Sequence, residues 1–414
     1  MRLINSLSIA ALFAISWPIL AFADLDDPFD ALENVDKGDP PYKDKEIQKW
    51  LRQAWEYEAG PGPAAGVILR KADFFRRKSY GPAQIKKAAM CLSKEQASLA
   101  LQYLDAYRNQ PYAKEVVRKS IESDVWSALK YDSIFLDVPG SDKWLKDAVM
   151  KAVKTSPGKL LSQNAQLNNL PYGAQILIEA AQGSVVQDPG EFLYFAKSHP
   201  TNSAVTDEAI EKAVRGAIGR SPWATSAVLQ NVSLYRKKPF RSEVVEKAVR
   251  YKVKYEPRMA VYEADAFVDE PFAAGILNEL VDSCKGEIFG GVQFFKNKLY
   301  APHIVAKAAA LAPWSALKYA DKYSDQPYAA ETIKSAASKN PEAVLSEREK
   351  IKGLSFGKDL IQDAESLLIR SNKVEDKCFI WMHPGYFQDL ENVRKALQNV
   401  DGKECLALSE KREE

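Results

Sequence analysis

Apolar positions along the chain recur at helical spacing and are interrupted at prolines. The stretch from 326 to 353 shows this pattern clearly. Its first half has one apolar face at the spacing i, i+4, i+7 and i+8, formed by Ala329, Ile333, Ala336 and Ala337. Pro327 is expected at the first helical position, and Asn340 followed by Pro341 is expected to cap and begin a second helix. The stretch is therefore predicted to form a helical hairpin.

Two short segments of the chain occur twice. WSALKY occupies residues 126–131 and 314–319, and QPYA occupies residues 110–113 and 326–329. Each QPYA tyrosine is followed five residues later by an aliphatic residue, and similar pairs recur along the chain. The predicted repeat anchors are Tyr112, Trp126, Tyr172, Phe240, Phe272, Trp314 and Tyr328. This recurrence predicts about ten repeats of about 28–35 residues each.

Two further details follow from the repeat. WSALKY is expected to open the second helix of its hairpin at both places. The apolar stripe of that helix is expected to contain Ala316, Leu317, Ala320 and Tyr323. Trp144, followed by Val149, is expected to be another anchor.

The pattern predicts an all-α fold, an α-solenoid of short helical hairpins with a C-terminal cap. Residues 41–370 resemble the general α-solenoid class, a superhelix like those of tetratricopeptide or HEAT repeats. The Leu-Gly step of the tetratricopeptide motif is missing and HEAT units are longer, so no named repeat family is matched. The predicted organisation is a signal peptide (1–23), an acidic flexible lead-in (24–40), the repeat domain (41–370) and the cap (371–414).

Composition restricts the class of protein. The chain has 414 residues, of which 46% are hydrophobic and 27% charged, so a sizeable core is expected. Its 57 basic and 55 acidic side chains give a net charge of only +2. A dedicated nucleic-acid binder is usually more basic, and nucleic acid is therefore not an expected partner.

The N-terminus has the pattern of an export signal. Arg2 precedes the apolar stretch 7–17, Pro18 follows it, and Ala21-Phe22-Ala23 forms a cleavage pattern. An uncleaved anchor is the alternative, although this stretch is short for a membrane span. The mature protein is expected to have no transmembrane segment and to be periplasmic, or alternatively extracellular.

The four cysteines are expected to fall into two classes. Export permits disulfides, and a Cys378–Cys405 bridge would stabilise the cap by about 3–4 kcal/mol. Cys91 and Cys284 lie about six repeats apart in the predicted array. They are therefore expected to be buried free thiols.

Neither a catalytic nor a metal-binding constellation is found in the sequence. His199, His303 and His383 lack the spacing of a metal site, and no cofactor-binding motif occurs. Glu365-Ser366 resembles the catalytic Glu-Ser pair of soluble lytic transglycosylases, which cleave peptidoglycan and also carry an exported α-solenoid. That family's downstream motif is missing here, and Glu365 is expected to be an ordinary exposed residue of the last repeat helix.

Two surface features are candidates for binding. The first is a basic cluster that offers sites for an anionic partner, with a solvated helix face as the alternative. Its candidate residues are Arg236, Lys237, Lys238, Arg241, Arg250 and Lys252. The second is a tryptophan stripe of Trp126, Trp223 and Trp314, which follows the joint between helices. It is expected either to contact a ligand or to close the hydrophobic seam of the array.

These features favour an exported, non-enzymatic scaffold that binds a protein or peptide in the cell envelope. One alternative is a peptidoglycan-associated protein related to the superhelical part of lytic transglycosylases. Another is a binder of an anionic cell-wall polymer or lipid through the basic cluster.

Overall fold

The structure is a computed structural model, which describes residues 27–37, 42–57, 60–387, 390–398, 400, 402–403 and 405–406. Every regular element in these ranges is helical and none is a strand, so the all-α prediction is confirmed. The predicted signal peptide lies outside the described residues. Within the predicted lead-in, Pro28–Glu33 form helix α1, and its Leu32 is buried.

The chain divides into two compact units. Unit 1 comprises residues 1–152 and 165–173, and unit 2 comprises residues 153–164 and 174–414. The division passes through three helices, which are α10 (Ser141–Thr155), α12 (Asn164–Leu167) and α13 (Gly173–Gln187). The other elements of unit 1 are α1, α2 (Asp44–Trp55), α3 (Gly62–Arg70), α4 (Ala72–Arg76), α5 (Gly81–Glu95), α6 (Ala97–Gln102), η1 (Leu104–Ala106), α7 (Ala113–Ser123), α8 (Val125–Lys130) and α9 (Asp132–Phe135).

Unit 2 contains the remaining elements. They are α11 (Pro157–Leu161), α14 (Pro189–Ser198), α15 (Asp207–Ala217), α16 (Pro222–Gln230), η2 (Val232–Tyr235), α17 (Arg241–Tyr255), α18 (Pro257–Tyr262), η3 (Ala264–Ala266), α19 (Ala273–Cys284), η4 (Lys285–Gly291), α20 (Val292–Phe295), α21 (Ala301–Leu311), α22 (Pro313–Lys318), η5 (Ala320–Lys322), α23 (Ala329–Lys339), α24 (Pro341–Ser346), α25 (Arg348–Lys352), α26 (Gly357–Arg370), α27 (Val374–Met382), η6 (Pro384–Tyr386) and α28 (Leu390–Ala396).

Segments predicted as two helices contain three helical elements. The long helix α21 is followed by the short helix α22 and then by the 3₁₀ turn η5. The chain leaves the α-helix at Tyr319, whose backbone has φ −108° and ψ 18°. Ala320 and Tyr323 are still buried, so the predicted apolar stripe continues through η5. WSALKY lies in the short helices α8 and α22, as predicted.

A recurring turn precedes the long helices and contains the aromatic anchors. The N–H of Ala329 donates to the carbonyl of Gln326 (3.0 Å), and the carbonyl of Tyr328 accepts from the N–H of Thr332 (3.2 Å). Because α23 begins only at Ala329, Pro327 lies in the turn, and its prediction as the first helical residue is wrong. The same place before a long helix is taken by Tyr112, Tyr172, Phe240 and Phe272.

The prediction of Trp144 as an anchor is wrong by one helical turn. Helix α10 begins at Ser141, so the residue in the anchor position is Gly140. Gly140 has φ +95°, a conformation that favours glycine over any residue with a side chain. A Cβ atom at Gly140 would lie 3.1 Å from Cζ2 of Trp144. The Trp144 ring therefore lies where the side chain of an anchor would begin.

A second repeated position, five residues before each anchor, was not predicted. Its residues are fully or almost fully buried and mostly aromatic: Phe75, Tyr107, Phe135, Leu167, Tyr235, Phe267, Phe295, Tyr323 and Ile351. Where this residue is tyrosine, its hydroxyl donates to the carbonyl seven residues earlier. Tyr235 reaches Val228 (2.7 Å) and Tyr323 reaches Ala316 (3.0 Å). The hydroxyl thus ties the third element of a repeat to its short helix.

Replacing Tyr235 with phenylalanine is expected to lower the free energy of unfolding by about 1–2 kcal/mol, because the Val228 carbonyl loses a buried donor. The ring itself fits, since Phe267 occupies the same position in the next repeat. Urea denaturation followed by circular dichroism measures the difference. Tyr255→Phe, at an exposed position, is the control. Equal loss in both variants would contradict the assigned hydrogen bond.

Ion pairs and hydrogen bonds join residues about one repeat apart. Lys296 Nζ lies 2.8 Å from Oδ2 of Asp325 in unit 2, and Arg108 Nη1 lies 2.6 Å from Oδ1 of Asp137 in unit 1. The anchor hydroxyl of Tyr328 donates across the same interval to the carbonyl of Lys296 (3.0 Å). Polar contacts therefore join segments of the chain that lie about 30 residues apart in both units.

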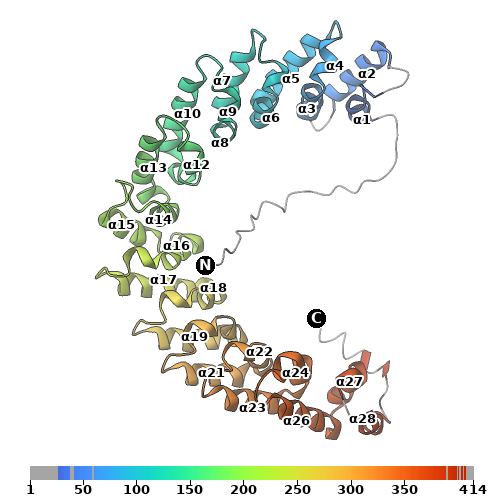
Figure 1. Cartoon of the computed structure of the whole chain (residues 1–414), viewed down its shortest axis with the longest axis vertical. Helices are drawn as coiled ribbons and strands as arrows, with labels where there is room; N and C mark the ends of the chain where they lie inside the picture. Colours follow the sequence, from blue (N-terminus) through green and yellow to red (C-terminus); the bar gives the residue numbers. More distant parts are fainter. Residues whose placement is uncertain are drawn as a thin grey trace. The chain divides into compact units, whose positions relative to one another are not determined.

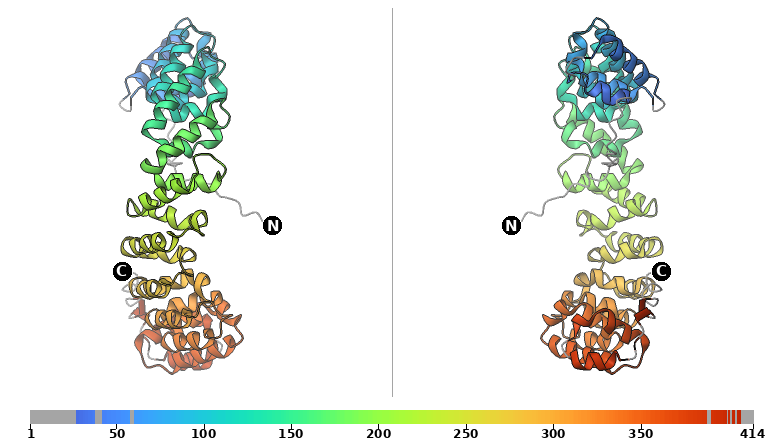
Figure 2. Two further views of the ribbon diagram at one scale, coloured as in Figure 1. Left: turned by 90° about the vertical axis from the view of Figure 1, so that its left-hand side faces the viewer. Right: turned by 90° about the vertical axis from the view of Figure 1, so that its right-hand side faces the viewer.

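The helices of unit 2 follow one another in two layers (Figures 1 and 2). The long helices α17, α19, α21 and α23 contact one another in chain order. The short helices α14 and α16 are in contact, as are α22 and α24, while η4 lies between α18 and α22. We call the layer of α14, α16, α18, α22 and α24 the short-helix layer.

The C-terminal part of unit 2 is formed by α26, α27 and α28. Helix α26 contacts both α27 and α28. The sulfur atoms of Cys378 and Cys405 lie 2.10 Å apart, which confirms the predicted disulfide. Cys91 and Cys284 are free thiols, as predicted, but they are half-buried and not fully buried.

Candidate binding face of the second unit

Large apolar side chains are exposed on successive helices of the short-helix layer. Trp223 on α16 is 50% exposed, Met259 and Tyr262 on α18 are 45% and 46% exposed, and Trp314 on α22 is 44% exposed. Single exposed apolar residues are common. Their recurrence on neighbouring short helices, however, indicates a surface suited to contact with a partner. We call these four residues the exposed apolar row.

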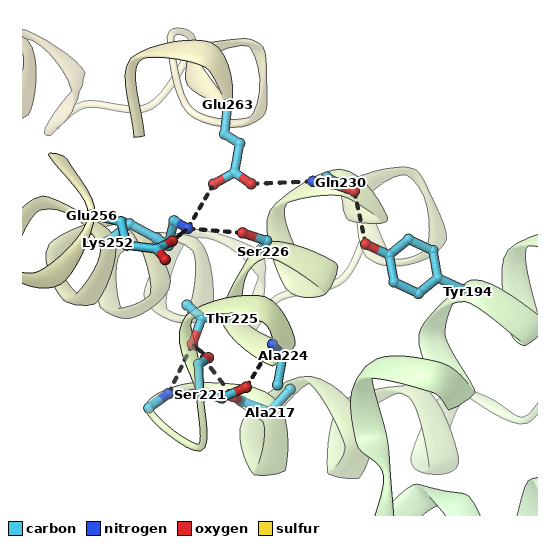
Figure 3. A network of polar contacts seen from close by, with 11 residues as sticks. Tyr194, Ala217, Ser221, Ala224, Thr225, Ser226, Gln230, Lys252, Glu256 and Glu263 are labelled. Carbon is cyan, nitrogen blue, oxygen red and sulfur yellow. Dashed lines mark hydrogen bonds and ion pairs between the residues drawn. The ribbon is translucent and has the colours of Figure 1, made fainter. Parts of the chain in front are cut away.

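A buried lysine contacts α16, one of the helices that carry this row. Lys252 on α17 is only 1% exposed, and its ammonium donates to Oγ of Ser226 on α16 at 2.9 Å (Figure 3). The ammonium also pairs with Glu256, and it lies 4.0 Å from Oε2 of the buried Glu263. A buried charge is tolerated only when it is paired and hydrogen-bonded. Lys252 and its partners therefore hold α16, α17 and α18 in one arrangement.

The polar network continues from Glu263 through Gln230 to Tyr194 (Figure 3). Nε2 of Gln230 donates to Oε1 of Glu263 (3.2 Å), and the hydroxyl of Tyr194 on α14 donates to Oε1 of Gln230 (2.8 Å). The Tyr194 ring lies beside Trp223, with centroids 5.8 Å apart. Burial, together with the charges of Glu263 and Glu191, raises the pKa of Tyr194. Tyr194 therefore remains a hydrogen-bond donor at neutral pH.

Local hydrogen bonds also fix the start of α16. Oγ of Ser221 accepts from the N–H of Ala224 (3.0 Å), which caps the helix. Thr225 donates its hydroxyl to the Ser221 carbonyl (2.9 Å) and accepts from the N–H of Gly219 (3.1 Å). These contacts, also drawn in Figure 3, set the position from which Trp223 projects.

At the other end of the row, lysines cover aromatic rings. The ammonium of Lys318 lies 4.8 Å from the ring centroid of Trp314 and 5.7 Å from that of Tyr319. Lys322 lies 4.8 Å from the Tyr319 centroid. A shallow depression adjoins these rings, and its lining includes Arg258, Glu287, Trp314, Ser315, Lys318 and Tyr319. This end of the row therefore combines aromatic surface with positive charge.

The predicted basic cluster is largely neutralised by carboxylates. Lys238 pairs with Asp207, Arg241 with Glu270, and Arg250 with Glu246, whereas Arg236 and Lys237 are exposed. Lys252 is buried and belongs to the network described above, so it is not available to a surface ligand. The structure thus does not bring the six residues together as one exposed cationic patch.

The exposure of the tryptophan stripe fits both roles expected from the sequence, whereas that of Glu365 does not fit its expected position. Trp223 and Trp314 are about half exposed and Trp126 is half-buried, so none of them is sealed in a core. Glu365 is buried, contrary to the expected exposed position. Its Oε1 lies 3.9 Å from Nη1 of Arg348 on α25 and has no hydrogen-bond partner among the described residues.

The histidines lie apart from any cluster of metal-ligand type. His199 stacks on Phe195, His383 stacks on Tyr386, and His303 is exposed. Within the described ranges, no three His, Cys, Asp or Glu side chains gather in a way that would hold a metal ion.

The free thiol of Cys91, in unit 1, is expected to react slowly. Burial, followed by the charge of Glu95, raises its pKa to about 11. At pH 8 about one thiol in a thousand would be ionised, against roughly a quarter of unperturbed thiols with a pKa near 8.5. Alkylation by iodoacetamide, followed by mass spectrometry, should therefore be much slower in the native protein than in urea. Equal rates would contradict this environment.

Comparison with known proteins found no match to the chain among protein families, curated proteins or solved structures. None of the described helices combines the length and apolar character needed to cross a bilayer. The function is therefore inferred from the chemistry of the exposed apolar row and its surroundings.

Proposed function

We propose that the protein is an exported α-solenoid scaffold that binds a protein or peptide partner through the exposed apolar row of unit 2. The proposal includes the array of about ten repeats expected from the sequence, a periplasmic location, and no catalytic role. Polar contacts at one-repeat spacing, such as Lys296 with Asp325, support the array. The bonded pair Cys378–Cys405 is compatible with export.

The observation that carries the proposal is the exposure of Trp223, Met259, Tyr262 and Trp314 on successive short helices. Aromatic side chains dominate the energetics of protein interfaces, where one buried anchor contributes about 2 kcal/mol or more. The network of Lys252, Glu263 and Gln230 limits movement of the helices that carry this row. A surface held in place before binding loses less conformational entropy on association.

Site-specific photocrosslinking in cells that make the protein tests this function. A benzophenone amino acid replaces Met259 in the row, and in a control chain it replaces Lys247, which is exposed on the long helix α17. We expect one envelope protein to be captured from position 259 and not from position 247. Capture from Lys247 alone would contradict the assigned face. Recovery of wall fragments or lipid without a protein would contradict the class of partner.

A further inference from the structure

We propose that the two WSALKY segments are matched recognition points, each of which binds an acidic peptide segment with an adjacent apolar side chain. This inference rests on the proposed function, because it specifies the partner of the same kind of surface. One copy lies on α8 in unit 1 and the other on α22 in unit 2.

Packing accounts for only two of the six repeated residues. Ala128 and Leu129 are fully buried in one copy, and Ala316 and Leu317 are fully buried in the other. Other short helices keep an apolar pair and only some of the remaining letters: α16 carries Trp223 directly after its first proline, and Tyr103 follows α6 as Tyr131 follows α8. For example, α24 reads PEAVLS, with its pair Val344-Leu345 buried. The core therefore explains the Ala-Leu pair but not the joint recurrence of Trp, Ser, Lys and Tyr in the two copies.

The four remaining residues meet solvent at least in part. Trp314 is exposed, and Ser315, Lys318 and Tyr319 are half-buried. In the other copy Lys130 is exposed, while the rest of this set is half-buried: Trp126, Ser127 and Tyr131. Ser127 also donates to Oδ2 of Asp124, the N-cap of α8 (2.5 Å). The recurrence of Trp, Lys and Tyr together, at positions that all meet solvent in part, favours a shared ligand contact.

The two copies also share a geometry. The ammonium of Lys130 lies 5.3 Å from the ring centroid of Tyr131, and that of Lys318 lies 5.7 Å from the ring centroid of Tyr319. In both copies the lysine thus lies over the tyrosine that follows it. An aromatic face with an ammonium beside it offers one apolar contact and one positive charge to the same ligand.

The positive charge of the two lysines indicates that the ligand carries a carboxylate. Many lysines and arginines of this protein pair with a carboxylate, as Lys296 does with Asp325. The contacts of the Lys318 ammonium are with aromatic rings, and no carboxylate of the described residues lies within ion-pair distance of it. The same holds, within those ranges, for Lys130. A carboxylate of a bound peptide is the complementary group.

The depression beside Trp314 favours a peptide over a glycan. Its charged and polar side chains are Arg258, Cys284, Glu287, Ser315, Lys318 and Tyr319, and they include neither asparagine nor glutamine. Glu287, its carboxylate, already lies 3.8 Å from Nε of Arg258. Sugar hydroxyls need acceptors as well as donors. The free groups here are mainly donors, which suits a carboxylate.

Isothermal titration calorimetry on the full chain tests this assignment with synthetic peptides. The acidic probe carries the block Glu-Phe-Asp-Leu, and the control probe carries Lys-Phe-Lys-Leu. We expect two acidic peptides to bind per chain, with affinity falling as salt rises, and no binding of the basic peptide. Equal binding of both probes, or binding of a chitin oligosaccharide in place of the acidic peptide, would overturn the proposal.

Variants assign the two sites. Lys318→Gln and Lys130→Gln should each leave one bound peptide, and the double variant should leave none. Lys318→Arg should retain both sites, which separates loss of charge from loss of fold. Lys334→Gln is the matched control, because its ammonium also lies over a ring, that of Phe356, outside both WSALKY segments. Two remaining sites in either single glutamine variant would overturn the assignment.

The result is separable from the test of the proposed function. If the crosslink at Met259 captures its partner while the acidic peptide does not bind, the binding face is retained and the matched recognition points are rejected. If the peptide binds with two sites and no partner is captured at Met259, the recognition points stand and the row is rejected as the docking surface.

Discussion

Replacing Lys252 with leucine is expected to lower the free energy of unfolding by about 3–5 kcal/mol, because the change leaves the buried Glu263 carboxylate without a cation. The helix register itself accepts an apolar residue at this position. Lys252 follows the anchor Phe240 at a fixed spacing. Leucine occupies the same position after two other anchors: Leu92 after Tyr80 and Leu368 after Phe356. The loss would therefore reflect an unpaired charge and not a misfit of shape. Urea denaturation monitored by circular dichroism measures it.

Two further variants separate the charge from the fold. Lys252→Leu combined with Glu263→Gln should regain most of the lost stability, since glutamine at 263 can still accept from Gln230 and needs no cation. Lys247→Leu removes an exposed lysine that pairs with Glu243 and should change stability little. If Lys252→Leu alone behaves like Lys247→Leu, the buried network does not hold these helices together.

The helices could be predicted because helix formation depends on neighbours in sequence. Asn340 and Pro341 cap and begin α24 as expected, with Oδ1 of Asn340 accepting from the N–H of Ala343 at 3.1 Å. The error at Pro327 has the same local origin, because a proline suits the turn before a helix as well as its first residue. The sequence alone does not distinguish these two places.

The wrong prediction at Trp144 shows that residue spacing does not determine where a helix begins. The aromatic-to-aliphatic spacing is satisfied at Trp144 and Val149, yet the anchor position is Gly140, one turn earlier. A helix repeats its faces about every turn, so spacing by itself fixes the helix and not its start. The completely buried position five residues before the anchor, for example Phe135, would have given the correct alignment.

The candidate site was less predictable because its contacts cross between helices. The carboxylates that neutralise the basic cluster include Asp207, Glu263 and Glu270, which lie outside the basic stretch itself. Counting charges along a stretch of sequence cannot include them. For the same reason the burial of Lys252 could not be recognised, since lysine is rarely found inside a protein without such partners.

The tryptophans mark the limit of interpretation from sequence. Packing in a seam and contact with a ligand both require a large aromatic residue after the joint between helices. The exposure of Trp223 and Trp314, about half of each side chain, is compatible with both roles. The repeated WSALKY has both components, because its Ala-Leu pair lies in the core while its Trp, Lys and Tyr meet the surface.

Replacing Phe267 with alanine is expected to lower the free energy of unfolding by about 3–5 kcal/mol, because the ring is completely buried at the position repeated before each anchor. In the proposed array each repeat depends mainly on its neighbours, so the loss should be greatest close to the substitution. Hydrogen exchange followed by mass spectrometry should show faster exchange in α18 and α19, with α26 least affected. Leu299→Ala, at a fully exposed position, should leave exchange unchanged. Uniform loss of protection throughout unit 2 would contradict a nearest-neighbour array and would favour a single cooperative core, since the same buried ring would then support every helix equally.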